Sequence, residues 1–208
     1  MNKNLAKVLS VLAHPIFINL LCLYLLFMLF PQLNHGMPLR IQLFFISFIF
    51  ISTSIIPVII VLAMRVLGKV KSVTLDSSEE RKLPYLVTFA LYVFNYYNFI
   101  KSPTTDPIIL QYLLACGAIV GSIAIINYFN KISIHMATLG AMCGLLATVG
   151  FAGFSDTRLA LILAIIFSSF VATARLSLQA HLPQQIYAGF ILGFVLMFVI
   201  LNFPLIHL

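Results

Sequence analysis

The stretch ARLSLQAHLPQQ, residues 174–185, places polar side chains at a regular spacing in a chain that is otherwise hydrophobic. His181 and Gln185 lie four residues apart, so they share one face once a helix begins. A glutamine carbonyl can accept a hydrogen bond from one nitrogen of a histidine ring and thereby fix the tautomer. The spacing therefore predicts a histidine whose other nitrogen is aimed as a nucleophile, with Arg175 close by in sequence.

Two further polar stretches supply residue types with matching chemistry. KISIHM, residues 131–136, holds Ser133 and His135, and DSSEERKLPY, residues 76–85, holds Arg81. Arginine guanidiniums are planar donors suited to phosphate oxygens, a serine adds a hydroxyl, and two histidines can act as nucleophile and proton donor. Polar side chains are costly in a membrane protein unless they pair or bind a ligand. The three stretches together predict a phosphate-binding or phosphoryl-transfer site.

Each polar feature also has a structural interpretation. Arg175 at the end of an apolar span can simply reach the lipid headgroups, although its fixed spacing to the histidine favours a site. The charged run from Asp76 to Lys82 can be a solvated loop whose charges neutralise one another. His14, followed by Pro15, either has a structural role at the start of the first span or lines the same pocket.

With 62% hydrophobic and only 8% charged residues, the chain is predicted to be an all-α integral membrane protein. Its apolar runs are continuous and long enough to cross a bilayer, which takes about 20 helical residues each. We expect one domain, residues 1–208, that forms a polytopic transmembrane helical bundle of six or seven spans. The seven expected spans are 8–30, 41–64, 84–100, 108–129, 133–151, 157–174 and 184–205. Six spans stay an alternative because the third run is short and polar and the sixth continues into an arginine.

Small residues and a proline predict how these spans pack. Glycines spaced four apart occur at 117 and 121, 140 and 144, and 189 and 193, so three helices are expected to approach closely at the centre of the bundle. Pro57 follows Ser-Thr-Ser within the second span, a combination that kinks membrane helices while the hydroxyls bond to backbone carbonyls.

Seven spans place the N-terminus and the connections 65–83, 130–132 and 175–183 on one side of the membrane, so the polar stretches share a face. This face carries nine of the twelve lysines and arginines. The positive-inside rule then favours a cytoplasmic N-terminus and a cytoplasmic polar face. Because the net charge of +7 gathers at span ends, it indicates lipid headgroups or an anionic pocket and excludes nucleic acid as a partner.

The polar stretches resemble the motifs of the type 2 phosphatidic acid phosphatase superfamily of membrane phosphatases and related haloperoxidases. The third motif of that family reads Ser-Arg, five residues, His, three residues, Asp, with glycines four and eight positions later. This chain matches the motif in register from Arg175 to Gly193. Two positions depart from it, since Ala174 replaces the serine and Gln185 replaces the aspartate.

The other two motifs are less complete. The second motif, Pro-Ser-Gly-His, appears as Ile132 to His135 and keeps its serine and histidine. The first motif, a lysine with Arg-Pro seven residues on, survives only as Arg81, because Thr74 stands at the lysine position and Pro84 is displaced. The family-like core covers about residues 65–200.

The resemblance implies roles for these residues. His181 would take the phosphoryl group, His135 would protonate the leaving oxygen, and Gln185 would orient the nucleophile in place of aspartate. The phosphate would be clamped by Arg81, Arg175 and Ser133, with no metal and no other cofactor. Because an amide cannot stabilise an imidazolium by charge, we expect a slow enzyme or none. The candidates to replace the phosphate contact of the missing motif lysine are Lys71, Lys82 and Lys131.

Two functions follow as hypotheses. The first is a membrane phosphatase-like protein of a bacterial inner membrane that binds a phospholipid phosphate or a polyprenyl diphosphate and hydrolyses it slowly through a phosphohistidine. The second is an inactive descendant of the family that binds lipid or serves as a structural subunit of a membrane complex.

The resemblance also implies that the site faces the periplasm or a lumen, whereas the positive-inside rule places it in the cytoplasm. A third hypothesis, haem ligation by His14, His135 and His181, lacks a facing pair of histidines at mid-membrane.

Overall fold

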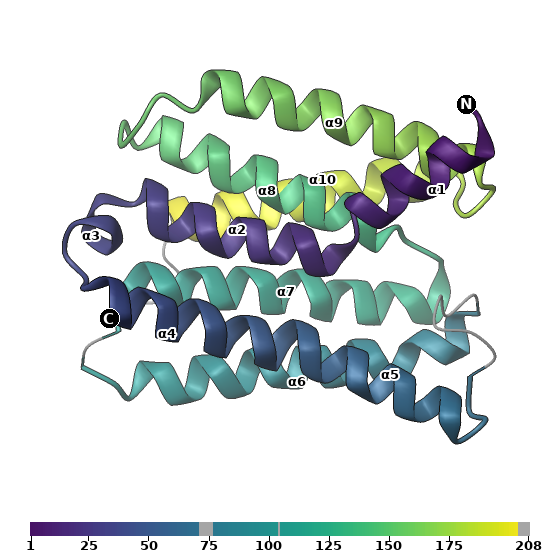
Figure 1. Cartoon of the computed structure of the whole chain (residues 1–208), viewed down its shortest axis with the longest axis horizontal. Helices are drawn as coiled ribbons and strands as arrows, with labels where there is room; N and C mark the ends of the chain where they lie inside the picture. Colours follow the sequence, from purple (N-terminus) through teal and green to yellow (C-terminus); the bar gives the residue numbers. More distant parts are fainter. Residues whose placement is uncertain (71–76, 104, 204–208) are drawn as a thin grey trace.

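The computed structural model describes residues 1–70, 77–103 and 105–203. Within these ranges every regular element is helical, which confirms the all-α class. The long helices run roughly parallel and antiparallel to one another in a bundle (Figure 1). The elements are α1 (Lys3–Leu12), α2 (Pro15–Leu29), α3 (Pro31–Asn34), α4 (Leu39–Phe50), the π-helix η1 (Ile51–Ile55), α5 (Ile56–Val66), α6 (Ser78–Ile100), α7 (Pro107–Phe129), α8 (Ile134–Phe151), α9 (Arg158–Ser177) and α10 (Pro183–Asn202).

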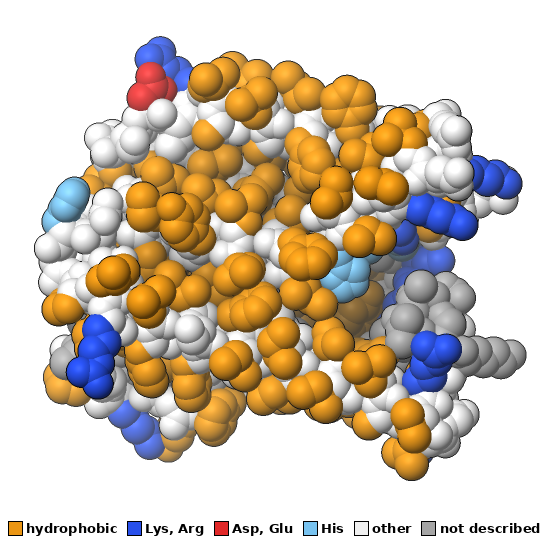
Figure 2. Space-filling model, viewed as in Figure 1, with side chains coloured by type: hydrophobic (Ala, Val, Ile, Leu, Met, Phe, Trp, Pro, Cys, Tyr) orange, Lys and Arg blue, Asp and Glu red, His pale blue; other side chains and the backbone are white. Residues whose placement is uncertain are grey.

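The helix lengths fit a membrane-spanning bundle. Five helices in the described ranges are long and apolar enough to cross a bilayer, and one of them is the continuous helix Leu39–Val66. Bent by 42°, α1 and α2 make a sixth candidate span when taken together. Apolar side chains cover the flank of the molecule, whereas lysines and arginines gather at its two ends (Figure 2). This distribution matches a hydrocarbon belt between two headgroup layers.

Two expected spans differ from the structure. The first, 8–30, is not one helix, because Pro15 cannot donate the hydrogen bond that would continue α1, and the chain restarts as α2. The third begins at Ser78 rather than at 84 and includes Pro84 within its second turn. At 23 residues α6 is long enough to span, but it is too polar to be among the helices that pass on composition.

Polar groups of α6 are turned toward the neighbouring helices. Asn95 is fully buried and donates to the Ser52 hydroxyl at 2.8 Å. The Tyr92 hydroxyl donates to the Asn19 carbonyl oxygen at 3.4 Å. Inward hydrogen bonds of this kind allow a helix with so many polar residues to lie among apolar ones.

The glycine pairs of α8 and α10 bring these two helices into direct backbone contact. A Cβ added to Gly140 would lie 2.1 Å from the Phe190 carbonyl oxygen, and one added to Gly193 would lie 1.9 Å from that of Ala137. The pair on α7 packs elsewhere, since Gly121 faces the Phe89 ring of α6. The close central contact is therefore made by two helices rather than by the three expected from the sequence.

The second span contains the irregularity expected near Pro57. The helix widens to η1 just before the proline, and the hydroxyls of Ser52 and Thr53 donate to the carbonyl of Ile49 at 3.0 and 2.7 Å. Hydroxyls thus bond to backbone carbonyls where the regular helical pattern is interrupted.

The predicted sharing of one face is visible in the bundle. The N-terminus, the start of α6, the turn from α7 to α8 and the turn from α9 to α10 all lie at the same end, on the right of Figure 1. The polar stretches therefore meet at one end of the bundle, although they are far apart in sequence.

Candidate functional site

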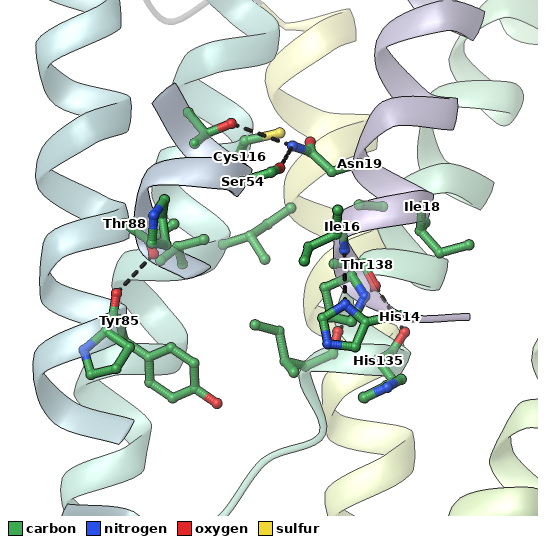
Figure 3. Close-up of a pocket in the computed structure, with 18 of the residues that line it drawn as sticks. His14, Ile16, Ile18, Asn19, Ser54, Tyr85, Thr88, Cys116, His135 and Thr138 are labelled. Carbon is green, nitrogen blue, oxygen red and sulfur yellow. Dashed lines mark hydrogen bonds between the residues drawn. The ribbon is translucent and has the colours of Figure 1, made fainter. Parts of the chain in front are cut away.

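A cavity of about 680 Å³ opens among the helices at this end and brings four predicted residues together. Arg81 comes from the first turn of α6, His135 from the start of α8, Arg175 from the last turn of α9 and His181 from the turn before α10. His14, between α1 and α2, also lines the cavity (Figure 3). Two guanidiniums and three imidazoles from five parts of the chain thus border one space.

Gln185 holds the His181 ring. The Gln185 Oε1 atom lies 3.3 Å from His181 Nδ1 and accepts the backbone N–H of Leu182 at 3.1 Å. Because a carbonyl oxygen only accepts, the proton of a neutral His181 sits on Nδ1 and the lone pair sits on Nε2. Gln185 itself stands outside the cavity lining, so it acts on the site through the histidine.

Burial and positive charge keep His181 neutral. The residue is only 9% exposed, and burial, together with the positive charges of Arg175 and Lys131, lowers its pKa to about 4. The hydrogen bond that His181 Nδ1 donates to Gln185 Oε1 raises the pKa but does not offset these effects. At neutral pH the ring is therefore an uncharged imidazole with a free Nε2 lone pair.

Arg81 faces the cavity because of the way α6 begins. The Ser77 hydroxyl accepts the Glu80 N–H and the Glu80 carboxylate accepts the Ser77 N–H, each at 3.3 Å, which fixes the first turn. Lys82 pairs with Glu79 and lies over the Tyr128 ring at 4.7 Å. The charged run is thus divided, with an outward lysine and an inward, buried Arg81.

Arg175 is half-buried and carries an unused donor. Among the described residues, its Nε atom is buried and has no hydrogen-bond partner. No aspartate or glutamate of the described ranges lines the cavity. An arginine with a buried free donor and no nearby carboxylate in the lining is suited to an anionic ligand.

Ser133 lies behind the cavity wall and is not part of the lining. It is fully buried between α8 and α10, where its N–H donates to the Gln185 carbonyl at 3.2 Å and its own carbonyl packs against Gly189. Its hydroxyl has no partner among the described residues. The structure therefore does not bring the predicted serine to the other phosphate-binding candidates.

His135 borders the cavity, and its ring is fixed by the N-terminal segment. Its Nε2 atom lies 3.2 Å from the Ser10 carbonyl oxygen of α1. Since that oxygen only accepts, a neutral His135 carries its proton on Nε2 and has its lone pair on Nδ1. Nδ1 is buried and has no hydrogen-bond partner in the described ranges.

The cavity continues inward to a polar cluster that was not singled out from the sequence. Asn19 donates to Thr53 at 3.3 Å and to Ser54 at 2.9 Å, and its carbonyl accepts from the Tyr112 hydroxyl at 3.2 Å. One wall of the cavity is formed by side chains at helical spacing on α6. From the arginine end to the inner cluster they are Arg81, Tyr85, Thr88 and Tyr92. Polar residues at helical spacing in a run of low hydropathy were the available signal.

The lysine candidates separate into three cases. Lys131 is near enough to influence His181 without lining the cavity, whereas Lys82 points outward. Lys71 and Thr74, the position of the missing motif lysine, lie outside the described residues. Within the described ranges, no three histidine, cysteine or carboxylate side chains converge as a metal-binding group would require.

Comparison with known protein families gives a match over part of the chain. The family model described as PAP2 superfamily matches residues 127–206. That region includes His135, Arg175, His181 and Gln185 but not Arg81. No curated protein and no solved structure matches the chain.

Proposed function

We propose, from the match of residues 127–206 to the PAP2 superfamily model, that the cavity binds the phosphate of a membrane lipid. The chemistry of the family and the apolar helices fit a membrane phosphatase-like protein. The observation that carries the proposal is the convergence of Arg81 and Arg175 with His135 and His181 on one cavity. The ligand is either a phospholipid phosphate or a polyprenyl diphosphate.

Charge and size both favour such a ligand. Two arginines line the cavity, and the buried Nε donor of Arg175 has no hydrogen-bond partner among the described residues, so a phosphate oxygen would supply an acceptor for it. A cavity of about 680 Å³ is far larger than a phosphate group needs. The remaining space, bordered by apolar residues such as Val58 and Val61 of α5, suits the lipid tail.

The same geometry supports slow hydrolysis. The Nε2 lone pair of His181 attacks phosphorus and forms a P–N bond while the P–O bond to the leaving group breaks. The leaving oxygen takes a proton, either from water or from His135 Nδ1 once that nitrogen has itself been protonated. Water then cleaves the phosphohistidine, which releases inorganic phosphate and restores the neutral ring. Gln185 orients the nucleophile but cannot stabilise its developing positive charge as a carboxylate would.

A comparison with His181→Ala tests this function. Purified protein in nanodiscs is incubated with phosphatidic acid or with a polyprenyl diphosphate, and released phosphate is measured. We expect slow release by the wild type, loss of release in His181→Ala, and no change in His35→Ala. His35 is a matched control because it lies at the end of α3 and does not line the cavity. Equal release by wild type and His181→Ala would exclude histidine catalysis.

A second candidate function is an inactive, lipid-binding member of the family, alone or as a subunit of a membrane complex. Two observations favour this function. Gln185, beside the nucleophile, is neutral, and Ser133 is not part of the cavity lining. This function predicts saturable binding of a lipid phosphate without phosphate release. Binding that is abolished in Arg175→Gln, with no turnover in the wild type, would establish it.

A further inference from the structure

We propose that His14 is an additional phosphate-binding residue, supplied by the N-terminal segment. This inference rests on the proposed function, because it assigns a further donor to the same anion. His14 lies outside the region matched by the PAP2 superfamily model. It lines the cavity together with Arg175 and His181, and its side chain is exposed.

The break between α1 and α2 positions His14. Pro15 has no N–H, and the residue before a proline is pushed to an extended conformation, as seen in the φ of −61° and ψ of 138° at His14. The two helices meet at 42°, so the side chain at the bend leaves the helical row. The bend places this ring at the cavity beside that of His135 (Figure 3).

Hydrogen bonding fixes the tautomer of His14. As the N-cap of α2, its Nδ1 atom accepts the backbone N–H of Ile16 at 3.4 Å. A nitrogen that accepts cannot carry the proton of a neutral imidazole, so that proton is on Nε2. No hydrogen bond from Nε2 to another described residue is present, which leaves an N–H donor at the cavity for a ligand oxygen.

The same break connects the N-terminal segment to His135. The His14 N–H bonds to the Val11 carbonyl at 3.0 Å instead of to that of Ser10, four residues back. The Ser10 carbonyl then accepts from His135 Nε2 at 3.2 Å. The two rings lie edge to face with centroids 5.8 Å apart. One bend thus supplies a donor and orients the neighbouring histidine.

The positive charge of the site explains why a neutral donor is useful there. Arg81 and Arg175 already repel each other, and both disfavour the protonated form of His181. A neutral imidazole N–H adds a hydrogen bond to a phosphate oxygen without adding a third fixed charge. His14 can therefore offset part of the loss of the motif lysine, whose position Thr74 occupies.

Two substitutions separate the proposed role of the His14 Nε2–H donor from the role of Nδ1 as the cap of α2. His14→Asn and His14→Ser keep a side-chain acceptor for the cap but lose the Nε2–H donor. Affinity for dioctanoyl phosphatidic acid and for farnesyl diphosphate is measured by titration calorimetry in nanodiscs. We expect both variants to bind about tenfold more weakly than the wild type, with unchanged unfolding temperatures, because a hydrogen bond to a charged group is lost. His35→Asn, remote from the cavity, should bind as the wild type does.

A spectroscopic readout completes the test. The imidazole ¹⁵N resonance of His14 Nε2 should shift when either lipid is added to the wild type. Unchanged affinity in both His14 variants, or an unshifted Nε2 resonance, overturns the inference while leaving the proposed function intact. If the wild type binds neither lipid, both the inference and the proposed function are wrong.

Discussion

The Oε1 atom of Gln185 lies 3.3 Å from Nδ1 of His181, and the same oxygen accepts the N–H of Leu182 at the start of α10. One amide oxygen therefore begins a helix and orients the imidazole that faces the cavity. Because the helix start and the ring share this atom, the direction of His181 is set by backbone geometry. Gln185 is the third residue of α10, so its backbone is fixed by the first turn of that helix.

Gln185→Glu should increase phosphate release. Glutamate keeps the length of the side chain and both contacts, and its charge would stabilise the imidazolium that forms as His181 attacks. The gain is expected to be at least tenfold, within the four orders of magnitude or so that such a carboxylate is worth in a serine protease. Gln184→Glu, on the exposed neighbour, is the charge-matched control. No gain in Gln185→Glu or in Gln185→Asp would favour the inactive lipid-binding function.

The stability of the protein should depend on pH through His181. The ring has a pKa of about 4 in the folded protein, below the value of 6.5 expected when unfolded. The unfolded chain therefore binds the proton more tightly, so the contribution of neutral His181 is complete above pH 6.5 and is lost as pH falls toward 4. As pH falls from 6.5 toward 4, the wild type should therefore lose more stability than the His181→Asn variant. The prediction is wrong if the difference in unfolding temperature between wild type and His181→Asn is the same at pH 7.5 and at pH 4.5.

Gly193→Ala should destabilise the contact between α8 and α10. The added Cβ would lie 1.9 Å from the Ala137 carbonyl oxygen, which belongs to backbone and cannot rotate away. We expect a loss of at least about 1–3 kcal/mol in the free energy of unfolding. Gly121→Ala is the control, because its Cβ would meet only the Phe89 ring, at 3.0 Å, and a side chain can move. Equal unfolding temperatures for the two variants would show that α8 and α10 separate easily.

Features set by local spacing could be predicted from the sequence. The spacing of four residues predicts the pairing of His181 with Gln185, although His181 lies in the turn before α10 and not on the helix itself. The close contact of α8 and α10 follows from glycines spaced four residues apart. The shared end of the polar stretches follows from the number of spans and their alternating direction. Each of these predictions needs only helix geometry and the thickness of a bilayer.

Features that depend on tertiary packing could not be predicted. Ser133 belongs to a recognisable motif, yet packing of α8 against α10 turns it away from the cavity. The contact between His135 and the Ser10 carbonyl joins residues 125 positions apart and exists only because the first span is broken. Tyr85, which no motif of the sequence includes, lines the cavity because of the neighbours that α6 meets. In each case the outcome depends on which neighbour a helix face meets.

Asn19→Leu should loosen the inner end of the cavity. Asn19 accepts from the Tyr92 and Tyr112 hydroxyls and donates to Thr53 and Ser54, so leucine would remove all four hydrogen bonds at once. Hydrogen bonds between membrane helices are worth about 0.6 kcal/mol on average, so we expect a loss of about 2 kcal/mol in the free energy of unfolding.

Asn98→Leu is the matched control for this change, because Asn98 is exposed and bonds only to the Phe94 carbonyl of its own helix. Reversible unfolding in mixed micelles measures both variants against the wild type. If the Asn19 cluster also shapes the tail-binding space, Asn19→Leu should weaken binding of a long-chain lipid phosphate more than that of a short-chain one. Equal effects of the two leucine variants on stability would mean that the hydrogen bonds from Asn19 to η1, α6 and α7 add nothing to the stability of the bundle.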